Sequence, residues 1–471
     1  MKELSYSKNT VFLMLAGVFS QVFAAVLKIL LSYRLREEGM AVYQVAICVY
    51  SVFLTPVLFG MPAAVTQFIS KKRGEKNEDS ISLGIRFSFG IMCLLGIICA
   101  FLMLISRRFF ALSLKEPDAE YAILLLSPSV FLVSVGAFAK SCFEGSSNML
   151  PCAVSQGAES FIKLILAYIF TCFFSIFSLK YAVAGAALAL TFGEAFATLI
   201  LFIFLAPTLK GLRPSYEKCQ NCGEIVAYAL PVTLYAVILS SLNLLENSVI
   251  RNSLLSVKFD GAAAQRLIFR YSPFTSAFDT VAAAGRLSKR GADWLYGAYF
   301  GYALTIIRFP AGLLRIFCVP FFPLASKCFA EKNTKRLSLA TSKLAKTMLL
   351  ISLPLSAFLT AFAPQITALV FGSSAYARML AFAAPLLVSA PLCELLSMLW
   401  YACGKTFPPF LCGFAASVLS IILSALLIRI PCLNILGTAV SAVISSFAEL
   451  FMLFIFTKRY INIKAPAHYL S

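Results

Sequence analysis

Charged side chains are scarce in this chain: Asp, Glu, Lys and Arg make up 13% of its 471 residues, against 60% for the hydrophobic types. A water-soluble protein of this length needs a far more polar surface, so a soluble class is excluded. The mean hydropathy of +0.87 is typical of a polytopic membrane protein. The apolar runs are about twenty residues long and do not alternate with a period of two, which predicts membrane-spanning helices and not barrel strands.

Residues and motifs that carry chemistry are equally scarce. The sequence has one histidine, His468, and a lone CxxC pair, Cys219 and Cys222, with no second pair to complete a zinc site. It has no GxxxxGK[ST] loop for nucleotide phosphates and no hydrolytic constellation of His, Ser and carboxylate. We therefore predict no catalytic residue, no cofactor and no resident metal. An enzyme remains open only as a membrane glycosyltransferase or polymerase.

Positive charge is in excess, with a formal net charge of +19. In a membrane protein this excess indicates loops held on the cytoplasmic side, so we predict no nucleic-acid partner. The Lys and Arg residues gather in alternate loops, with clusters such as 71–73, 335–336 and 458–459. This bias predicts an even number of spans in the cell membrane with both termini cytoplasmic.

Twelve apolar spans can be read from the sequence, and we interpret the first as a retained helix and not a removed signal peptide. They are 11–33, 41–69, 84–105, 121–143, 152–177, 181–205, 224–249, 298–324, 340–363, 379–403, 408–428 and 435–457. The segment 250–297 is predicted to be a long extracytoplasmic loop. Part of it would lie on the membrane surface if its apolar residues are used, although a solvated loop is the simpler interpretation.

An internal repeat supports two halves. Gly185 is followed after sixteen residues by Leu-Phe-Ile-Phe, and Gly437 is followed by the same four residues at the same interval. Pro62 and Pro323 are each followed by Phe and Lys at equal spacings. The sequence thus predicts two six-helix bundles, 1–210 and 211–471, related by a pseudo-twofold axis along the membrane normal, with the cargo site between them.

Ionisable residues inside the spans should face a cavity or a partner, because burying a charge in lipid costs about 3 kcal/mol or more. Lys28, Arg308, Arg315 and Arg251 are the candidates for a cationic substrate cavity, since arginine suits phosphate through two parallel hydrogen bonds. For Lys28, snorkelling to the interface is the alternative. Candidates for cation coupling or for structural ion pairs are Glu159, Lys163, Glu194, Glu246 and Glu394, and Glu449 is a further intramembrane acid.

Two of these charges have a preferred interpretation. Glu159 and Lys163 are four residues apart on one helix face, which favours a structural ion pair. Three prolines, Pro62, Pro310 and Pro323, are predicted to bend their helices and to act as hinges, with packing kinks as the alternative.

The sequence resembles the multidrug/oligosaccharidyl-lipid/polysaccharide exporter superfamily, and within it the polysaccharide-transport branch of stage V sporulation protein B and MurJ-type lipid II flippases. Three stretches carry the resemblance: the opening, with Lys28, Arg34, Glu37-Glu38-Gly39 and Gly60-Met61-Pro62; Phe143-Glu-Gly145 through Pro151 and Gln156 to Glu159 and Lys163; and Leu295-Tyr296-Gly297 through Pro310 to Phe322-Pro323-Leu324-Ala325.

The resemblance implies a V of two helix bundles around a central cationic cavity. It implies outward flipping of an undecaprenyl-pyrophosphate-linked oligosaccharide or peptidoglycan precursor by alternating access, with basic residues of helices 1 and 8 at the head group. Sodium or proton coupling stays open, and we expect a monomer. The alternatives are a cation-coupled multidrug exporter of the same superfamily and a non-transporting scaffold for envelope or spore assembly. The sequence identifies neither the cargo nor the coupling ion.

Overall fold

The computed structural model of the chain describes residues 2–74, 78–146, 148–210, 222–257, 287–331 and 333–460. The described residues form helices and turns and contain no β-strand, which confirms the all-α prediction for them. In chain order the helices are α1 (Lys2–Leu58), α2 (Gly60–Gly74), α3 (Glu78–Ser113), α4 (Ala119–Gly145), α5 (Leu150–Ser175), α6 (Leu179–Lys210), α7 (Cys222–Ser256), α10 (Lys289–Gly297), the π-helix η2 (Ala298–Ala303), α11 (Leu304–Ile316), α12 (Cys318–Ala330), α13 (Thr334–Ala361), α14 (Ala363–Phe371), α15 (Ala377–Ala383), α16 (Leu386–Ala402), α17 (Phe407–Leu427) and α18 (Leu436–Tyr460).

Eleven segments of the described chain are long and apolar enough to cross a membrane. All but the first coincide one for one with an expected span, and the first, Met14–Arg73, contains the two opening spans. Its 60 residues would extend about 90 Å as one straight helix, roughly three times the hydrocarbon thickness. It is not straight, because the backbone leaves the helical conformation at Arg36, where φ is 54° and ψ is −172°. The twelve predicted spans are therefore all represented.

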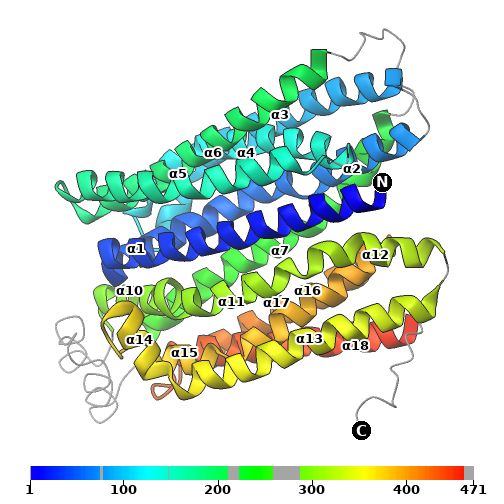
Figure 1. Cartoon of the computed structure of the whole chain (residues 1–471). Coiled ribbons are helices and arrows are strands. Elements are labelled where there is room, and N and C mark those ends of the chain that lie inside the picture. The colour runs from blue at the N-terminus through cyan, green and yellow to red at the C-terminus, as the bar shows by residue number, and fades with distance from the viewer. Residues whose placement is uncertain are drawn as a thin grey trace. The chain divides into compact units, whose positions relative to one another are not determined.

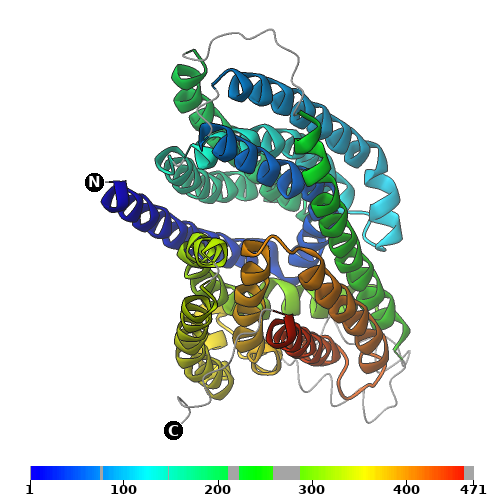
Figure 2. The same ribbon diagram turned by 90° about the vertical axis from the view of Figure 1, so that its right-hand side faces the viewer.

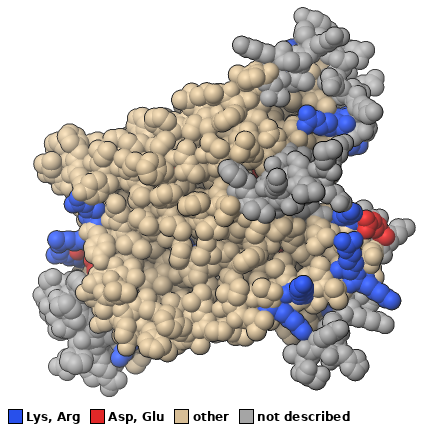
Figure 3. Space-filling model, viewed as in Figure 1, with Lys and Arg blue, Asp and Glu red and all other residues tan. Residues whose placement is uncertain are grey.

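The outward surfaces of these helices are apolar. α3, for example, exposes Leu94, Phe101 and Ile105. In the view of Figure 3 the broad middle of the molecule carries almost no charge, and Lys and Arg gather toward the two ends of the helices. Such a surface would aggregate in water, whereas it suits a lipid environment in which every backbone group is satisfied inside a helix. The chain is a multi-pass membrane protein.

The chain divides into two compact units, Met1–Leu244 and Leu245–Ser471. The predicted bundle limits, 1–210 and 211–471, stay a prediction, and the boundary between these compact units lies inside α7. The reason is that the two parts of α7 pack in different units. Ile225 and Ala229 join the hydrophobic core of unit 1, while Glu246 bonds to Ser420 of unit 2.

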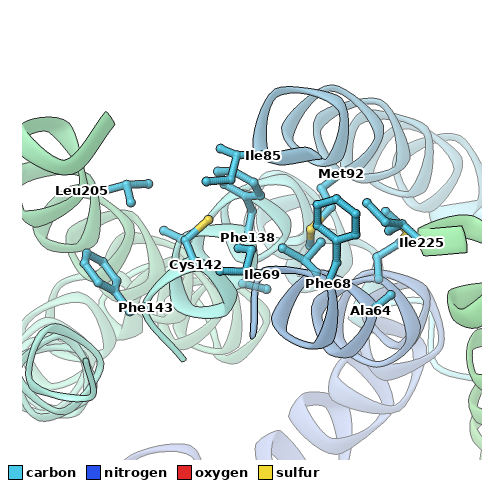
Figure 4. Packing of buried hydrophobic residues seen from close by; sticks show 14 of the residues in the cluster. Ala64, Phe68, Ile69, Ile85, Met92, Phe138, Cys142, Phe143, Leu205 and Ile225 are labelled. Carbon is cyan, nitrogen blue, oxygen red and sulfur yellow. The ribbon is translucent and has the colours of Figure 1, made fainter. Parts of the chain in front are cut away.

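In unit 1, α4 is the central helix: α1, α2, α3 and α6 all pack against it, and α5 packs between α1 and α6. Figure 1 shows α3, α4, α5 and α6 as long helices lying side by side. The buried core of unit 1 contains Phe68 of α2, Ile85 of α3, Phe138 of α4 and Leu205 of α6. Figure 4 shows these side chains pointing toward one another. This packing fixes the positions of the polar residues on α4, α5 and α6.

In unit 2, α16 has the corresponding role, with α11, α12, α13 and α18 packed against it and α17 packed on α18. In Figure 2 α16, α17 and α18, coloured orange to red, lie next to one another, with α18 seen nearly end-on. The core includes Cys318, Leu395 and Leu399. Trp400 is buried and donates a hydrogen bond from Nε1 to Thr457 Oγ1 at 3.0 Å, which links α16 to α18.

Each of the two units contains a helix that is broken at one point. α1 ends at Leu58 and α2 begins at Gly60; α11 ends at Ile316 and α12 begins at Cys318. A proline follows each break, Pro62 and Pro320, and each lacks the N–H that would bond to the carbonyl four residues earlier, which is the last residue of the preceding helix. The structure thus matches Pro62 with Pro320, whereas the sequence repeat paired it with Pro323.

The repeated glycines also have the same role. A Cβ on Gly185 would lie 2.9 Å from the backbone oxygen of Phe170, and a Cβ on Gly437 would lie 2.7 Å from the backbone carbon of Leu427. A glycine near the start of α6 in unit 1, and of α18 in unit 2, therefore lets each helix approach the backbone of the helix before it. This equivalence supports the internal repeat.

The structure also bears on the predicted loop 250–297, on the CxxC pair and on the predicted hinge prolines. The segment 250–297 is not a loop at its ends, because α7 continues to Ser256 and α10 begins at Lys289. Residues 258–286 and the pair Cys219 and Cys222, apart from the backbone of Cys222, lie outside the described part. Of the expected hinges, Pro62 and Pro323 lie within α2 and α12, and Pro310 lies inside α11 without interrupting it. Their action as hinges stays a prediction.

Candidate functional site

The main polar cluster of unit 1 lies between α4, α5 and α6. The Lys163 ammonium donates to Glu159 Oε1 at 2.7 Å on its own helix and to Glu194 Oε1 at 2.5 Å on α6. Lys140 on α4 approaches the other carboxylate oxygen of Glu159, with Nζ and Oε2 3.7 Å apart. The predicted pair of Glu159 and Lys163 is therefore confirmed as an ion pair, and it is part of a four-residue network.

This cluster, hereafter the unit-1 charge network, is largely enclosed. The exposed fraction of the side chain is 14% for Lys163, 16% for Glu159 and 17% for Glu194, and rises to 35% for Lys140. Gly193 makes the enclosure possible, since a Cβ at that position would lie 2.2 Å from Lys163 Cγ. The lysine stem thus passes over a glycine between α5 and α6 and brings its charge between the two acids.

Helix α1 covers this network. The Tyr50 hydroxyl lies 2.8 Å from Ser129 Oγ of α4. Tyr50 is also close enough to interact electrostatically with Glu194, Lys163 and Glu159. Farther along α5, Ser160 Oγ lies 2.7 Å from Ser20 Oγ of α1. These two contacts link α1 to α4 and α5 beside the network.

In unit 2 the residue Arg251 has a structural partner. Its guanidinium donates to Asp293 Oδ1 at 2.6 Å and lies 5.2 Å from the centre of the Tyr296 ring, and only 4% of its side chain is exposed. The Tyr296 hydroxyl in turn donates to Asn247 Oδ1 at 2.5 Å. These contacts fasten the end of α7 to α10. A role of Arg251 in lining a substrate cavity stays a prediction.

The other predicted cations of unit 2 lie on α11. Arg308 and Arg315 are both exposed and, seven residues apart, share one face of the helix. Arg315 is 65% exposed, and its Nε lies 3.8 Å from Glu394 Oε2 of α16, which makes a loose ion pair. The π-helix η2 directly precedes this helix, and such stretches are frequent at functional sites.

The acidic residues Glu246, Glu394 and Glu449 of unit 2 lie on three different helices, α7, α16 and α18. Glu246 accepts a hydrogen bond of 2.5 Å from Ser420 Oγ, which joins α7 to α17. Glu394 and Glu449 lie near enough to repel each other, from α16 and α18. Among the described residues no group of three or more His, Cys, Asp and Glu could hold a metal ion.

Lys28 lies half-buried on α1 in unit 1, whereas the three arginines belong to unit 2. A cavity that all four would line stays a prediction. Sequence reasoning missed Lys140, which it counted among the basic residues of the cytoplasmic side although the predicted span 121–143 contains it, and Asp293, which it placed in the predicted loop 250–297. For Lys140 a signal existed: it follows an apolar run without a turn residue between.

Comparison with known proteins adds two family matches. The model described as "Polysaccharide biosynthesis protein" matches residues 6–257, which is more than half of the chain. The model described as "Lipid II flippase MurJ" matches residues 296–470. Together the two matches cover most of both units.

Two proteins of Bacillus subtilis (strain 168) are similar in sequence. Stage V sporulation protein B is 24% identical over 388 residues, which are 82% of this chain and 70% of that protein. Lipid II flippase MurJ is 21% identical over 368 residues, or 74% of this chain and 62% of that protein. The chain thus spans less than two thirds of the length of the flippase.

Solved structures show the same fold. An inward-facing multidrug resistance transporter of the MATE family has a TM-score of 0.70 and 16% identity, with 97% of this chain and 99% of that chain covered. A MOP superfamily transporter from Pyrococcus furiosus has a TM-score of 0.70 and 15% identity, with 97% and 96% covered. The chain belongs to the polysaccharide biosynthesis protein family, and it has the fold of these MOP superfamily transporters.

Proposed function

We propose that the chain moves a lipid-linked anionic sugar outward across the cell membrane by alternating access. The cargo would be an undecaprenyl-pyrophosphate oligosaccharide or a peptidoglycan precursor. Both termini would lie in the cytoplasm, and one chain would suffice for transport, without catalysing a reaction. The similarity to stage V sporulation protein B and to lipid II flippase MurJ supports this class of cargo.

The observation that carries the proposal is the pair of exposed arginines on α11. Arg308 and Arg315 share one face of an otherwise largely apolar helix. Charges on a membrane helix are expensive unless they face water or a partner, so this face is suited to an aqueous path. A guanidinium offers a pyrophosphate two parallel, charge-assisted hydrogen bonds. Lys28 would add a further cation from unit 1.

The multidrug exporter is the weaker alternative because of the unit-1 charge network. An exporter of cationic drugs needs acidic groups that are available to the drug. Glu194, the acid of the N-terminal half best placed for this purpose, is already bonded to Lys163, and Glu159 is bonded to the same lysine. Coupling to sodium or protons would then fall to the acids of unit 2, of which Glu246 and Glu394 are the candidates.

Translocation of a fluorescent undecaprenyl-pyrophosphate sugar in proteoliposomes tests the proposal. Hydrogen bonds to charged groups contribute about 1.5–3 kcal/mol, so Arg308→Ala should lower the initial rate at limiting substrate roughly tenfold to a hundredfold. Lys28→Ala should act in the same direction. Arg336→Ala is the matched control, because Arg336 is an exposed arginine of the same unit on α13.

A wild-type rate equal to that of empty liposomes, under sodium, proton and potential gradients, would contradict the proposal and favour the drug exporter or the scaffold. Equal loss in Arg308→Ala and Arg336→Ala would show that α11 has no special part in transport.

A further inference from the structure

Two carboxylates from different helices converge on one ammonium group in unit 1. Glu159 of α5 and Glu194 of α6 both accept from Lys163 Nζ, at 2.7 and 2.5 Å. The two acids also lie near enough to repel each other. Without a cation between them this arrangement would be unstable in an enclosed site. The cation in place is part of the chain itself.

The network is electrically balanced. Two lysines, Lys140 and Lys163, face two glutamates, Glu159 and Glu194, and Tyr50 and Ser129 add neutral hydroxyl groups beside them. The contributions of the lysines differ. Lys163 touches both acids from inside, whereas Lys140 is the most exposed member and approaches only Glu159, at 3.7 Å.

The backbone is adapted to this one side chain. Gly193, the neighbour of Glu194 in sequence, leaves the space through which the Lys163 stem passes. Any larger residue at 193 would meet the stem. The packing of α5 on α6 therefore supports the position of the ammonium and not only its charge.

We propose that Lys163 is a tethered counter-cation that takes the place of a soluble monovalent cation in unit 1 and so determines the ion requirement of this half. In the wild-type protein the two glutamates then have no need of sodium. Removal of the ammonium together with its stem would leave one uncompensated negative charge and a space between two carboxylates. One monovalent cation restores neutrality there, whereas a divalent ion would leave an excess positive charge.

Thermal unfolding of the purified full-length protein tests this inference without any transported cargo, so its outcome is independent of the proposed function. The Tm is measured in sodium chloride and in choline chloride at equal ionic strength. Lys163→Ala should be stabilised by sodium more than the wild type, with a Tm that rises with the logarithm of the sodium concentration, because a ligand bound to the folded state stabilises it by mass action.

Two further variants isolate the site. Lys163→Met removes the charge but fills the space, so its sodium response should equal that of the wild type. Glu159→Gln/Lys163→Ala keeps the space but removes one of the two acids, so its response should also return to the wild-type level. Any sodium effect that arises in unit 2 is common to all four proteins and cancels in the comparison.

Equal sodium responses in Lys163→Ala and the wild type would overturn the inference. The inference would also be overturned if sodium raised the Tm of the wild type and Glu159→Gln abolished that rise, because a soluble cation would then already bind beside Lys163. A Lys163→Ala protein that cannot be purified folded in either salt would also contradict it, because sodium should then replace the ammonium. Binding of radioactive sodium at one ion per chain above the wild-type level provides the second measurement.

Discussion

The contacts of Arg251 give it a structural role, which can be tested separately from a role in substrate binding. Its guanidinium is buried against Asp293 and the Tyr296 ring. Removing one partner of a buried pair leaves the other charge uncompensated and costs about 3–5 kcal/mol. We expect Arg251→Met to lower the Tm strongly, and Arg251→Met/Asp293→Leu to recover most of the loss. Thermal unfolding of the detergent-solubilised chain measures both.

Arg308→Met is the control, because it removes an exposed arginine of the same unit. A stable Arg251→Met protein that no longer transports would contradict the structural role. Such a result would return Arg251 to the substrate cavity that the sequence suggested.

Spacing along one helix is the part of the site that the sequence could predict. Glu159 and Lys163 are four residues apart, so one helical turn brings them together. The contact from Lys163 to Glu194 spans two helices, and its existence depends on Gly193, whose role is visible only when α5 and α6 are packed. Asp293 was missed for a similar reason, because its partner lies on another helix across residues 258–286.

At the scale of single elements, the break in the helical backbone of α1 lies at one residue, Arg36. Arg36 has φ 54° and ψ −172°, a region that is essentially restricted to glycine and costs other residues about 1–3 kcal/mol. Arg36→Gly should therefore raise the Tm. Arg36→Ala keeps the Cβ and removes only the charged side chain, so it should leave the Tm near that of the wild type.

An equal rise in Arg36→Gly and Arg36→Ala would indicate that the charge, and not the backbone conformation, limits stability. A fall of similar size in both variants would show that the arginine side chain stabilises the turn, and a fall in Arg36→Gly alone would show that glycine gives no relief of backbone strain at this position. The Tm of the three proteins in one detergent distinguishes these outcomes.

Apolar runs predicted the helices well, and they failed where charge is buried in pairs. Ten expected spans coincide with single candidate segments, while the start of the helical segment before α11 was placed too late. Lys289, Arg290 and Asp293 interrupt the hydropathy there, yet α10 is helical because Ser288 caps it by accepting from the Gly291 amide. Arg251 then compensates the charge of Asp293.

For the molecule as a whole, the internal repeat accounts for features that the two units have in common. The orientation of the chain in the membrane stays a prediction. Both units contain a broken helix and a closely packed glycine at equivalent positions. The bias of Lys and Arg predicts cytoplasmic termini. With that orientation, the turn between α16 and α17 lies inside and the turn between α17 and α18 lies outside, because α17 is a single span.

Cysteines in these two turns test the orientation. Cys432 is exposed in the outer turn, whereas Cys403 is buried in the inner turn, and burial raises the pKa of its thiol more than the nearby Lys405 lowers it. A membrane-impermeant maleimide should therefore label Cys432 in intact cells and react poorly with Cys403, since the thiolate is the reactive form. Cys432→Ser should abolish this labelling.

Adding Lys405→Cys to Cys432→Ser places an exposed thiol in the inner turn, and it should be labelled only after the cells are made permeable. The opposite pattern, with residue 405 labelled from outside and Cys432 protected, would invert the orientation and, with it, the direction of transport that we propose.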